Sequence, residues 1–339
     1  MDIVLTSLAF VIAAACAGAM GFAIQRGATC TVAAVDELVT KRSARRLASL
    51  IEASVWVAGG LLLAQALHRL PTMPGGYALT PWTVIGGVLL GLGAFVNGAC
   101  VFGAIARFGS GQWAYLLTPV GFYLGCVSVT ALFGTPAHSK LPYGSPVLST
   151  PAWVAGLFVL FVVWRLARPL WRREPDATPP EHASLFKRAS NALTARIWSP
   201  HAATIVIGIT FVVMLLAVGA WAYTDLLAEL ARGMAASLVA RCLLLLAMLA
   251  GAAWGGWTAG RFRHTRITPA QVLKCTAGGV LMGWGSLLIP GGNDGLILVG
   301  MPLLWPYAWV AFVSMGVAIA AAQLLTRHSP VAAAKSHPT

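Results

Sequence analysis

Two cysteines stand at the ends of short polar interruptions in long apolar stretches of the chain. Cys30 closes the segment RGATC, and Cys100 closes the segment NGAC. A thiol is soft, polarisable and a weak hydrogen-bond donor. It could contact a sulfur-bearing anion without binding it too tightly, as conduction requires. A second interpretation stays open, because free cysteines are also common as small buried residues.

Two arginines flank these interruptions. Arg26 begins the first, and Arg107 follows the second. Guanidinium groups and the N-termini of half-helices both favour anions, so the two arginines predict an attraction of negative charge towards the cysteines. The alternative is that both anchor the chain at the membrane interface, where long basic side chains snorkel.

Three further polar residues fall at or near membrane depth. Asn97 lies in the NGAC segment, whereas Asn293 and Asp294 lie in a third interruption, GGNDG. Polar groups at this depth are costly and are functional candidates by default. A plain turn remains the alternative for GGNDG, since Asn and Gly supply a positive φ. Asp294 suits an anion path poorly, so we expect it to pair with a basic residue or to help in gating.

Glycines break the helical pattern at each of the three interruptions. Irregular backbone at bilayer depth is tolerated only where it is buried in protein or lines a watery cavity. The interruptions are therefore expected to point inward, at a path through the protein. The break-forming glycines are Gly27, Gly98, Gly291 and Gly292.

The composition places these residues in a membrane protein. The 339 residues are 58% hydrophobic and 10% charged, and their mean hydropathy is +0.78. Soluble domains carry about 25% charged residues, so lipid must cover part of this apolar surface. The apolar runs are long and continuous, which indicates helices and argues against an outer-membrane barrel.

The hydropathy pattern predicts an all-α, polytopic membrane protein with about nine transmembrane helices. The apolar run 31–39 is too short to cross a bilayer of roughly 20 helical residues, and it is expected to dip in and return. A second dipping piece is expected after GGNDG. The predicted spans cover residues 3–24, 47–67, 82–97, 113–133, 153–170, 202–222, 238–257, 272–289 and 305–325.

Charge sets the expected orientation. The net charge is +13, and most basic residues fall in the segments 40–46, 165–200 and 259–274. Basic loops mark the cytoplasmic side of an inner membrane, which places the N-terminus in the periplasm and the C-terminus in the cytoplasm. No aromatic-plus-basic pattern supports a nucleic-acid partner.

The predicted parts are an N-terminal membrane half 1–170, a basic linker 171–200 with a short amphipathic helix in its second part, a C-terminal membrane half 201–326 and a polar tail 327–339.

The two membrane halves carry a weak internal repeat. RGATC resembles NGAC in the first half, and the second half has a basic glycine loop at Gly260 and the GGNDG break. Two breaks per half on either side of a long linker are typical of the pseudo-twofold inverted repeats of transporters.

No enzyme or metal motif accompanies these features. The sequence has no HExxH, P-loop or GxSxG pattern, and its six cysteines form no CxxC pair. We therefore expect no catalytic residues, no metal site and no cofactor, and we predict that the protein is not an enzyme.

The glycine–cysteine segments resemble the YeeE/YedE family of sulfur-transport membrane proteins. The resemblance rests on RGATC, on NGACVFG with the glycines that follow it, and on the region from Gly283 through Gly292. It implies an inner-membrane protein of about nine spans with inward-dipping loops, uptake of thiosulfate or a related compound, and cysteines that pass the anion along. A small cytoplasmic sulfur-carrier protein is implied as a partner. Cys30 and Cys100 match two family cysteines, whereas the third, which follows Gly-Gly in the family, is missing from GGNDG.

The sequence thus predicts a transporter or channel in the lipid bilayer for uptake of a small sulfur-containing anion. Arg26 and Arg107 would attract the anion, Cys30 and Cys100 would line its path, and Asn293 would complete the path. Two alternatives remain open: a membrane-embedded protein that handles thiols or persulfides, and a soft-metal or metalloid transporter that uses thiolates.

Overall fold

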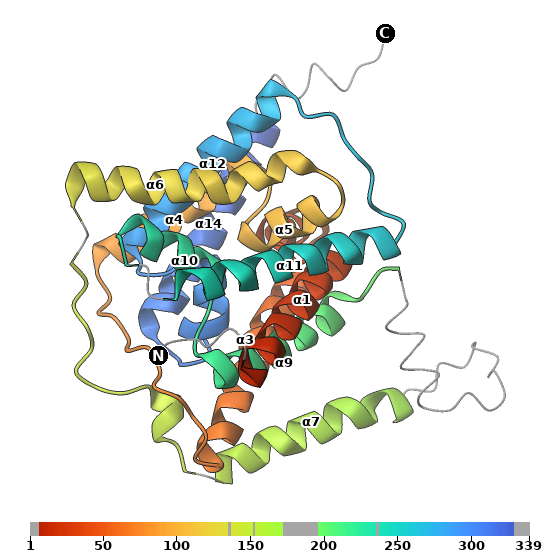
Figure 1. The fold of residues 1–339 in the computed structure, drawn as a ribbon, viewed down its shortest axis with the longest axis vertical. Helices are drawn as coiled ribbons and strands as arrows, with labels where there is room; N and C mark the ends of the chain where they lie inside the picture. The colour runs from red at the N-terminus through yellow and green to blue at the C-terminus, as the bar shows by residue number, and fades with distance from the viewer. Residues whose placement is uncertain (1–6, 135–136, 152, 172–195, 235–236, 329–339) are drawn as a thin grey trace, which may run out of the picture.

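The computed structural model describes residues 7–134, 137–151, 153–171, 196–234 and 237–328. These residues form helices joined by turns, and their only β-type pairing is an isolated bridge between Tyr77 and Lys140. The all-α prediction is confirmed (Figure 1). The expected amphipathic helix of the linker lies outside the described residues.

Sixteen helical elements make up the described part of the chain. They are α1 (Leu8–Gly27), α2 (Thr31–Lys41), α3 (Arg45–Ala66), α4 (Pro81–Asn97), α5 (Val101–Gly109), η1 (Trp113–Leu116), α6 (Leu117–Phe133), η2 (Pro146–Ser149), α7 (Trp153–Trp171), α9 (Pro200–Val218), α10 (Tyr223–Ala231), α11 (Leu238–Thr258), α12 (Pro269–Leu288), α13 (Asn293–Gly295), η3 (Leu296–Gly300) and α14 (Pro306–His328).

Membrane-length helices dominate the structure. Among the described residues, seven helical segments are long and apolar enough to cross a bilayer, or eight if the pair α12 and α13–η3, bent by 51°, is one span. The apolar part of α7, Trp153–Arg165, is shorter. This agrees broadly with the predicted nine spans and with the predicted dipping segments, since α2 and α5 continue α1 and α4 after a break.

One predicted feature of the second half differs. Residues 223–231, expected as an external turn, form the helix α10. The break that matches RGATC therefore lies between Gly219 and Ala222, after α9, whereas Gly260 lies in the loop after α11. The sequence hides this break, because apolar residues on both sides of Gly219 read as one continuous span.

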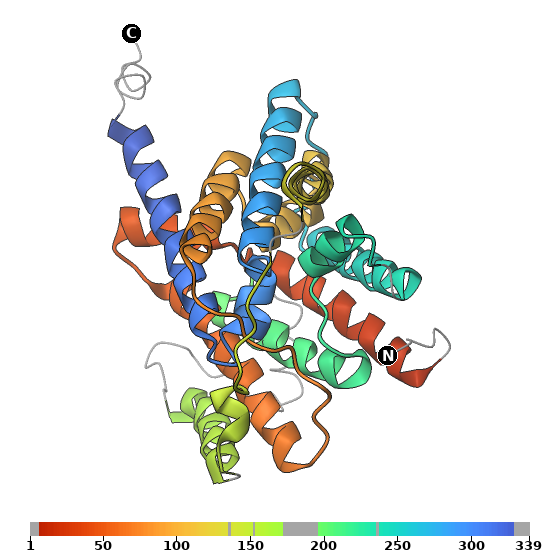
Figure 2. The ribbon, with the colours of Figure 1, turned by 90° about the vertical axis from the view of Figure 1, so that its left-hand side faces the viewer.

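The helices pack in pairs that are related by an internal two-fold pattern. Exchanging α1 with α9, α3 with α11, α4 with α12, and α6 with α14 maps the observed contacts onto one another. The α1–α11 contact corresponds to α3–α9, the α4–α14 contact to α6–α12, and the α2–α14 contact to α6–α10. Figure 2 shows α4 between α14 and α12. The contact pattern thus agrees with the two repeats expected from the sequence.

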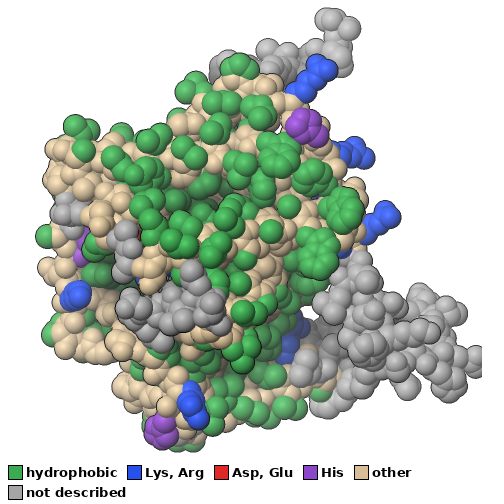
Figure 3. Space-filling model, viewed as in Figure 1, with side chains coloured by type: hydrophobic (Ala, Val, Ile, Leu, Met, Phe, Trp, Pro, Cys, Tyr) green, Lys and Arg blue, Asp and Glu red, His purple; other side chains and the backbone are tan. Residues whose placement is uncertain are grey.

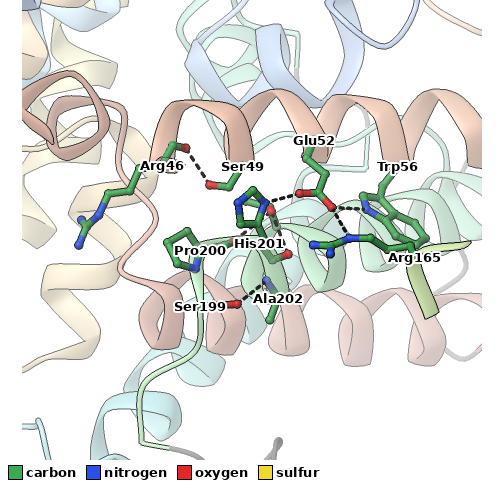
Figure 4. Close-up of polar contacts among 10 residues, drawn as sticks. Arg46, Ser49, Glu52, Trp56, Arg165, Ser199, Pro200, His201 and Ala202 are labelled. Carbon is green, nitrogen blue, oxygen red and sulfur yellow. Dashed lines mark hydrogen bonds and ion pairs between the residues drawn. The ribbon is translucent and has the colours of Figure 1, made fainter. Parts of the chain in front are cut away.

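The helix α7 lies at the periphery (Figure 1) and contacts α3. Figure 4 shows the polar cluster at this contact, in which Glu52 of α3 faces three donors. Arg165 of α7 donates to Glu52 Oε1 at 3.2 Å, Trp56 Nε1 donates to the same oxygen at 3.4 Å, and the ring of His201 bonds Oε2. One carboxylate therefore joins α3, α7 and α9.

The surface matches a lipid environment. Large apolar side chains such as Phe133, Leu246, Trp254 and Trp257 are more than half exposed. Figure 3 shows hydrophobic side chains spread over one face, with most of the visible Lys and Arg at its margin. An apolar band of this extent is typical of membrane proteins, since monomeric soluble proteins rarely expose such patches.

Candidate functional site

The first residues of four half-helices meet in the interior. Thr31 begins α2, Val101 begins α5, Tyr223 begins α10 and Asn293 begins α13. Asn293 Nδ2 donates to Thr31 Oγ1 at 3.4 Å, and the Tyr223 hydroxyl donates to the carbonyl of Val101 at 3.0 Å. The internal two-fold pattern exchanges these two hydrogen bonds. We call these four buried residues the central ring.

Both predicted cysteines lie beside the central ring. Cys30 and Cys100 are the N-cap residues of α2 and α5, and their thiols lie close enough to influence each other. The backbone N–H of Thr31 donates to Cys100 Sγ at 3.1 Å. Cys100 is buried and Cys30 is half-buried. The two interruptions therefore bring two thiols together from positions 70 residues apart.

Close packing around Cys30 depends on a glycine. A Cβ atom at Gly103 would lie 2.5 Å from Cys30 Sγ, well inside van der Waals contact. Only glycine leaves room for the sulfur at this position of α5. The glycine that follows NGAC in the sequence thus shapes the space in which the thiol sits.

In the second half, the first turns of the half-helices α10 and α13 carry carboxyl groups, whereas in the first half the N-caps of α2 and α5 carry thiols. Asp294 is buried, and both of its oxygens accept hydrogen bonds from Thr224: Oδ2 from the backbone N–H at 3.3 Å and Oδ1 from the hydroxyl. Gly295 N–H also donates to Oδ1 at 3.0 Å. Asp225, next to Thr224 in α10, lies near the Gly292 backbone and is close enough to Asp294 for the two charges to interact. The expected pairing of Asp294 with a basic residue is not seen among the described ion pairs.

Two cavities approach the central ring. One, of about 410 Å³, is lined by Cys30, Gly103, Arg107, Asp36, Arg46 and Gln323 among others; we call it the thiol-side cavity. The other, of about 220 Å³, is lined by Asp225, Glu229, Arg232, Arg241, Trp221 and Tyr307 among others; we call it the carboxyl-side cavity.

The helix α14 shows how far apart the two cavities are. Tyr307 near its start lines the carboxyl-side cavity, and Gln323 near its end lines the thiol-side cavity. Sixteen helical residues span about 24 Å. The cavities therefore lie towards opposite ends of α14, with the buried ring between them.

Of the two predicted arginines, Arg107 lies at the thiols. It lines the thiol-side cavity, and its guanidinium donates to the Tyr115 hydroxyl at 2.9 Å and to the carbonyl of Gly98 at 3.0 Å. Arg26 is buried elsewhere: it donates to Thr258 Oγ1 at 2.8 Å and its guanidinium lies 4.8 Å from the centre of the Phe22 ring. Arg26 lines neither cavity.

Asn97 shapes the turn that carries Cys100. Its Nδ2 donates to the carbonyl of Ala99 at 2.7 Å, and its Oδ1 accepts from Thr118 at 3.0 Å. Gly98 then turns the chain with a φ of +72°, which glycine adopts without strain. In this arrangement the Asn97 amide is occupied by protein partners, whereas the buried Oδ1 of Asn293 has no hydrogen-bond partner in the described part of the chain.

The other break glycines occupy crowded positions. A Cβ atom at Gly27 would lie 2.2 Å from the Cβ of Ala203, and one at Gly292 would lie 2.2 Å from the Thr224 hydroxyl. Gly291 has a φ of +156°. Gly27 thus lets α1 approach α9, while Gly292 brings Asp294 within reach of Thr224.

Several residues of the site went unrecognised in the sequence. Thr31, Tyr223 and Thr224 belong to no motif that the sequence singles out, and the sequence predicts an external turn at Asp225. The signal that could have found them is the position directly after a break: Thr31 follows Cys30, and Tyr223 follows the segment that begins at Gly219.

The described residues contain no group of three or more His, Cys, Asp or Glu that could hold a metal ion. A fold of broken membrane helices whose ends meet between two cavities is typical of a membrane transporter, because such breaks supply polar backbone at bilayer depth. The site and the fold together define a multi-pass transport protein.

A family model described as "Sulphur transport" matches residues 26–321. The chain therefore belongs to the sulphur transport family, YeeE/YedE, whose members are transporters and not enzymes. It is 25% identical over 329 residues to the thiosulfate transporter TsuA of Escherichia coli (strain K12), covering 88% of this chain and 90% of that protein. The resemblance found in the sequence is thus confirmed, and the protein is a membrane transporter of sulfur compounds.

Proposed function

We propose that this protein takes up thiosulfate, or a closely related small sulfur-containing anion, through the central ring. Cys30 and Cys100 then offer S–H groups to the anion on one side of the ring. Asn293 offers an amide from the second half, where the resembling family has its third cysteine. The thiosulfate named for the relative TsuA supports this choice of substrate.

The observation that carries the proposal is the hydrogen bond from the Thr31 N–H to Cys100 Sγ at 3.1 Å. It holds one thiol at the ring, and the neighbouring thiol of Cys30 opens onto the thiol-side cavity. Arg107 lines the same cavity and adds positive charge where an anion leaves the ring. Weak donors suit this place, since a conducted ion must bind and then leave.

The charged loops support an inward direction. Arg46 lines the thiol-side cavity, and Arg261 and Arg263 line an adjoining cavity that also contains Arg107. Basic residues gather on the cytoplasmic side of inner-membrane proteins. The thiol-side cavity therefore faces the cytoplasm in our proposal, the carboxyl-side cavity faces the periplasm, and the C-terminus is cytoplasmic. A reporter fused at position 180 that proved periplasmic would reverse this assignment.

A small sulfur-carrier protein in the cytoplasm fits this direction as a partner. The family resemblance supports it, and the basic charge around the thiol-side cavity would favour an acidic surface on such a carrier. Co-purification with an acidic carrier, lost on raising the salt concentration, is the expected result.

Uptake of labelled thiosulfate tests the proposed function. Cells without other sulfur importers would express the wild type, Cys100→Ala, Cys30→Ala or Cys242→Ala, with protein amounts measured in the membrane fraction. Cys242 lies on α11 away from both cavities, so it is the matched control. We expect uptake to fall at least about tenfold in the first two variants and to persist in the control. A well-expressed wild type that takes up no thiosulfate would refute the substrate, and full uptake by Cys100→Ala would refute the thiol path.

A further inference from the structure

The carboxyl-side cavity contains hydrogen-bond donors that no described residue accepts. Trp221 lines it and is only 6% exposed, yet its indole N–H has no hydrogen-bond partner among the described residues. The Nε of Arg232, which lines the same cavity, is likewise buried and unpartnered in the part of the chain that the structure describes. Buried donors are rarely left without an acceptor, so two in one cavity point to an occupant that supplies oxygen atoms.

The charged side chains that line the cavity differ in their partners. Glu229 forms an ion pair with Arg241. Asp225 lies near Asp294 and the Gly292 backbone. Arg232 forms no ion pair among the described residues.

The Arg232 charge also acts on two loops near the cavity. Tyr77, which also lines the cavity, belongs to the loop before α4. Burial raises the pKa of Tyr77, and the Arg232 charge opposes this. His138, in the loop after α6, has its pKa lowered first by burial and further by Arg232. The guanidinium therefore lies near these two loops as well as at the end of α10.

We propose that the carboxyl-side cavity is a binding site for a small tetrahedral oxyanion, to which Arg232 and Trp221 donate hydrogen bonds. Arginine is the side chain best suited to oxyanions, because its planar fork offers several donors. The 220 Å³ volume equals that of about seven water molecules at about 30 Å³ each, enough for such an anion and a few waters. The proposal rests on the proposed function, since the anion bound here is the one carried to the thiols.

Asp225 limits how tightly this site binds an anion. Its carboxylate shares the cavity with Arg232 and weakens the hold on a negative ion. A capture site must release its ligand towards the ring, and a nearby carboxylate favours release. Removing the two charges should therefore change anion affinity in opposite directions.

The test measures binding and transport separately. Purified wild type, Arg232→Gln, Trp221→Phe and Asp225→Asn would be titrated with thiosulfate, sulfite and sulfate, with thermal stabilisation as the readout, and the same variants would be assayed for the KM of thiosulfate uptake. We expect Arg232→Gln to weaken binding and raise the KM at least about tenfold. Trp221→Phe should have a smaller effect in the same direction, and Asp225→Asn should tighten binding.

Two controls keep the result interpretable. Arg69→Gln removes a positive charge from the loop before α4, which also carries Tyr77, but Arg69 does not line the cavity. Arg232→Lys keeps the positive charge and replaces Arg232→Gln in the test if that variant does not fold. Equal effects of Arg232→Gln and Arg69→Gln would overturn the site, as would a wild type that none of the three anions stabilises. A wild type that is stabilised by an anion through Arg232 but takes up no thiosulfate would keep the site and refute the proposed transport.

Discussion

Thr31 and Asn293 are 262 positions apart, and the amide of Asn293 donates a hydrogen bond to the Thr31 hydroxyl at 3.4 Å. This contact joins the first residue of α2 to the first residue of α13. Because Thr31 also holds Cys100 Sγ through its backbone, the thiols of one half and the GGNDG segment of the other form one polar centre. In the proposed path, the Asn293 amide takes the place of the missing third cysteine, and it already bonds to Thr31.

The side chain at position 293 gives the first prediction. Asn293→Asp keeps the shape but adds a negative charge beside Asp294, so we expect thiosulfate uptake to fall at least about tenfold. Asn293→Cys restores a weak neutral donor, and uptake should stay within a few-fold of the wild type. Labelled-thiosulfate uptake, normalised to the protein in the membrane, measures both. Equal activity of the aspartate and cysteine variants would contradict a role for position 293 in contacting the anion.

The packing of Gly103 against Cys30 gives the second. In Gly103→Ala the new methyl group would lie 2.5 Å from Cys30 Sγ, and overpacking of this kind costs about 1–3 kcal/mol. We expect a lower melting temperature of the purified protein and reduced uptake. The double variant Gly103→Ala with Cys30→Ala removes the clashing sulfur and should recover part of the stability but not the uptake. Additive losses in the double variant would show that the two residues do not meet.

Glu52 gives the third, which concerns stability alone. Its carboxylate accepts bonds from Arg165, Trp56 and His201 on a face with large exposed apolar side chains (Figure 4). Glu52→Gln leaves the Arg165 charge without its partner, and we expect a loss of about 1–3 kcal/mol, seen as a lower melting temperature in detergent. Glu37→Gln is the control, since its ion pair with Arg46 is more exposed and such pairs contribute about 0–1 kcal/mol. A smaller effect at Glu52 than at Glu37 would contradict this account.

His138 gives the fourth, a dependence on pH. Burial lowers the pKa of His138 below its usual range, although its bond to the carbonyl of Leu287 opposes this and the Arg232 charge adds to it. The neutral ring is therefore favoured in the folded protein. Its contribution is present above the usual histidine pKa of about 6.5 and is lost as the pH falls through the lower folded value.

Melting temperatures at pH 7.5 and pH 5 check this prediction. The wild type should lose stability at pH 5, and His138→Asn should lose less, because no ring remains to be protonated. His264→Asn, on an exposed loop after α11, should behave as the wild type does. An unchanged pH response in His138→Asn would assign the effect to other groups.

The thiols show which features of the site the local sequence can predict. Gly, Ala and Cys at the interruptions predicted breaks in apolar helices, and Cys30 and Cys100 do stand at the N-caps of α2 and α5. The prediction worked because backbone breaks in a bilayer demand glycine and small residues locally. Arg26 carried the same kind of local signal as Arg107, yet only Arg107 lines the thiol-side cavity. Which way a long side chain turns depends on its neighbours: Thr258 and Phe22 face Arg26 from α11 and α1.

The sequence by itself determined that this chain is an all-α, multi-pass membrane protein of the sulphur transport family, since hydropathy and the glycine–cysteine segments are local properties of the chain. Only the tertiary structure decided that α10 is a fourth half-helix, that Tyr223 and Thr31 complete the central ring, and that Asp225, Arg232 and Trp221 share a cavity. The ring contacts join segments from opposite halves of the chain, and Tyr77 from the first half lines the cavity together with Asp225, Arg232 and Trp221. They follow from the packing of α1 on α9 and of α4 on α12, and no local pattern of residue types encodes which buried surfaces meet.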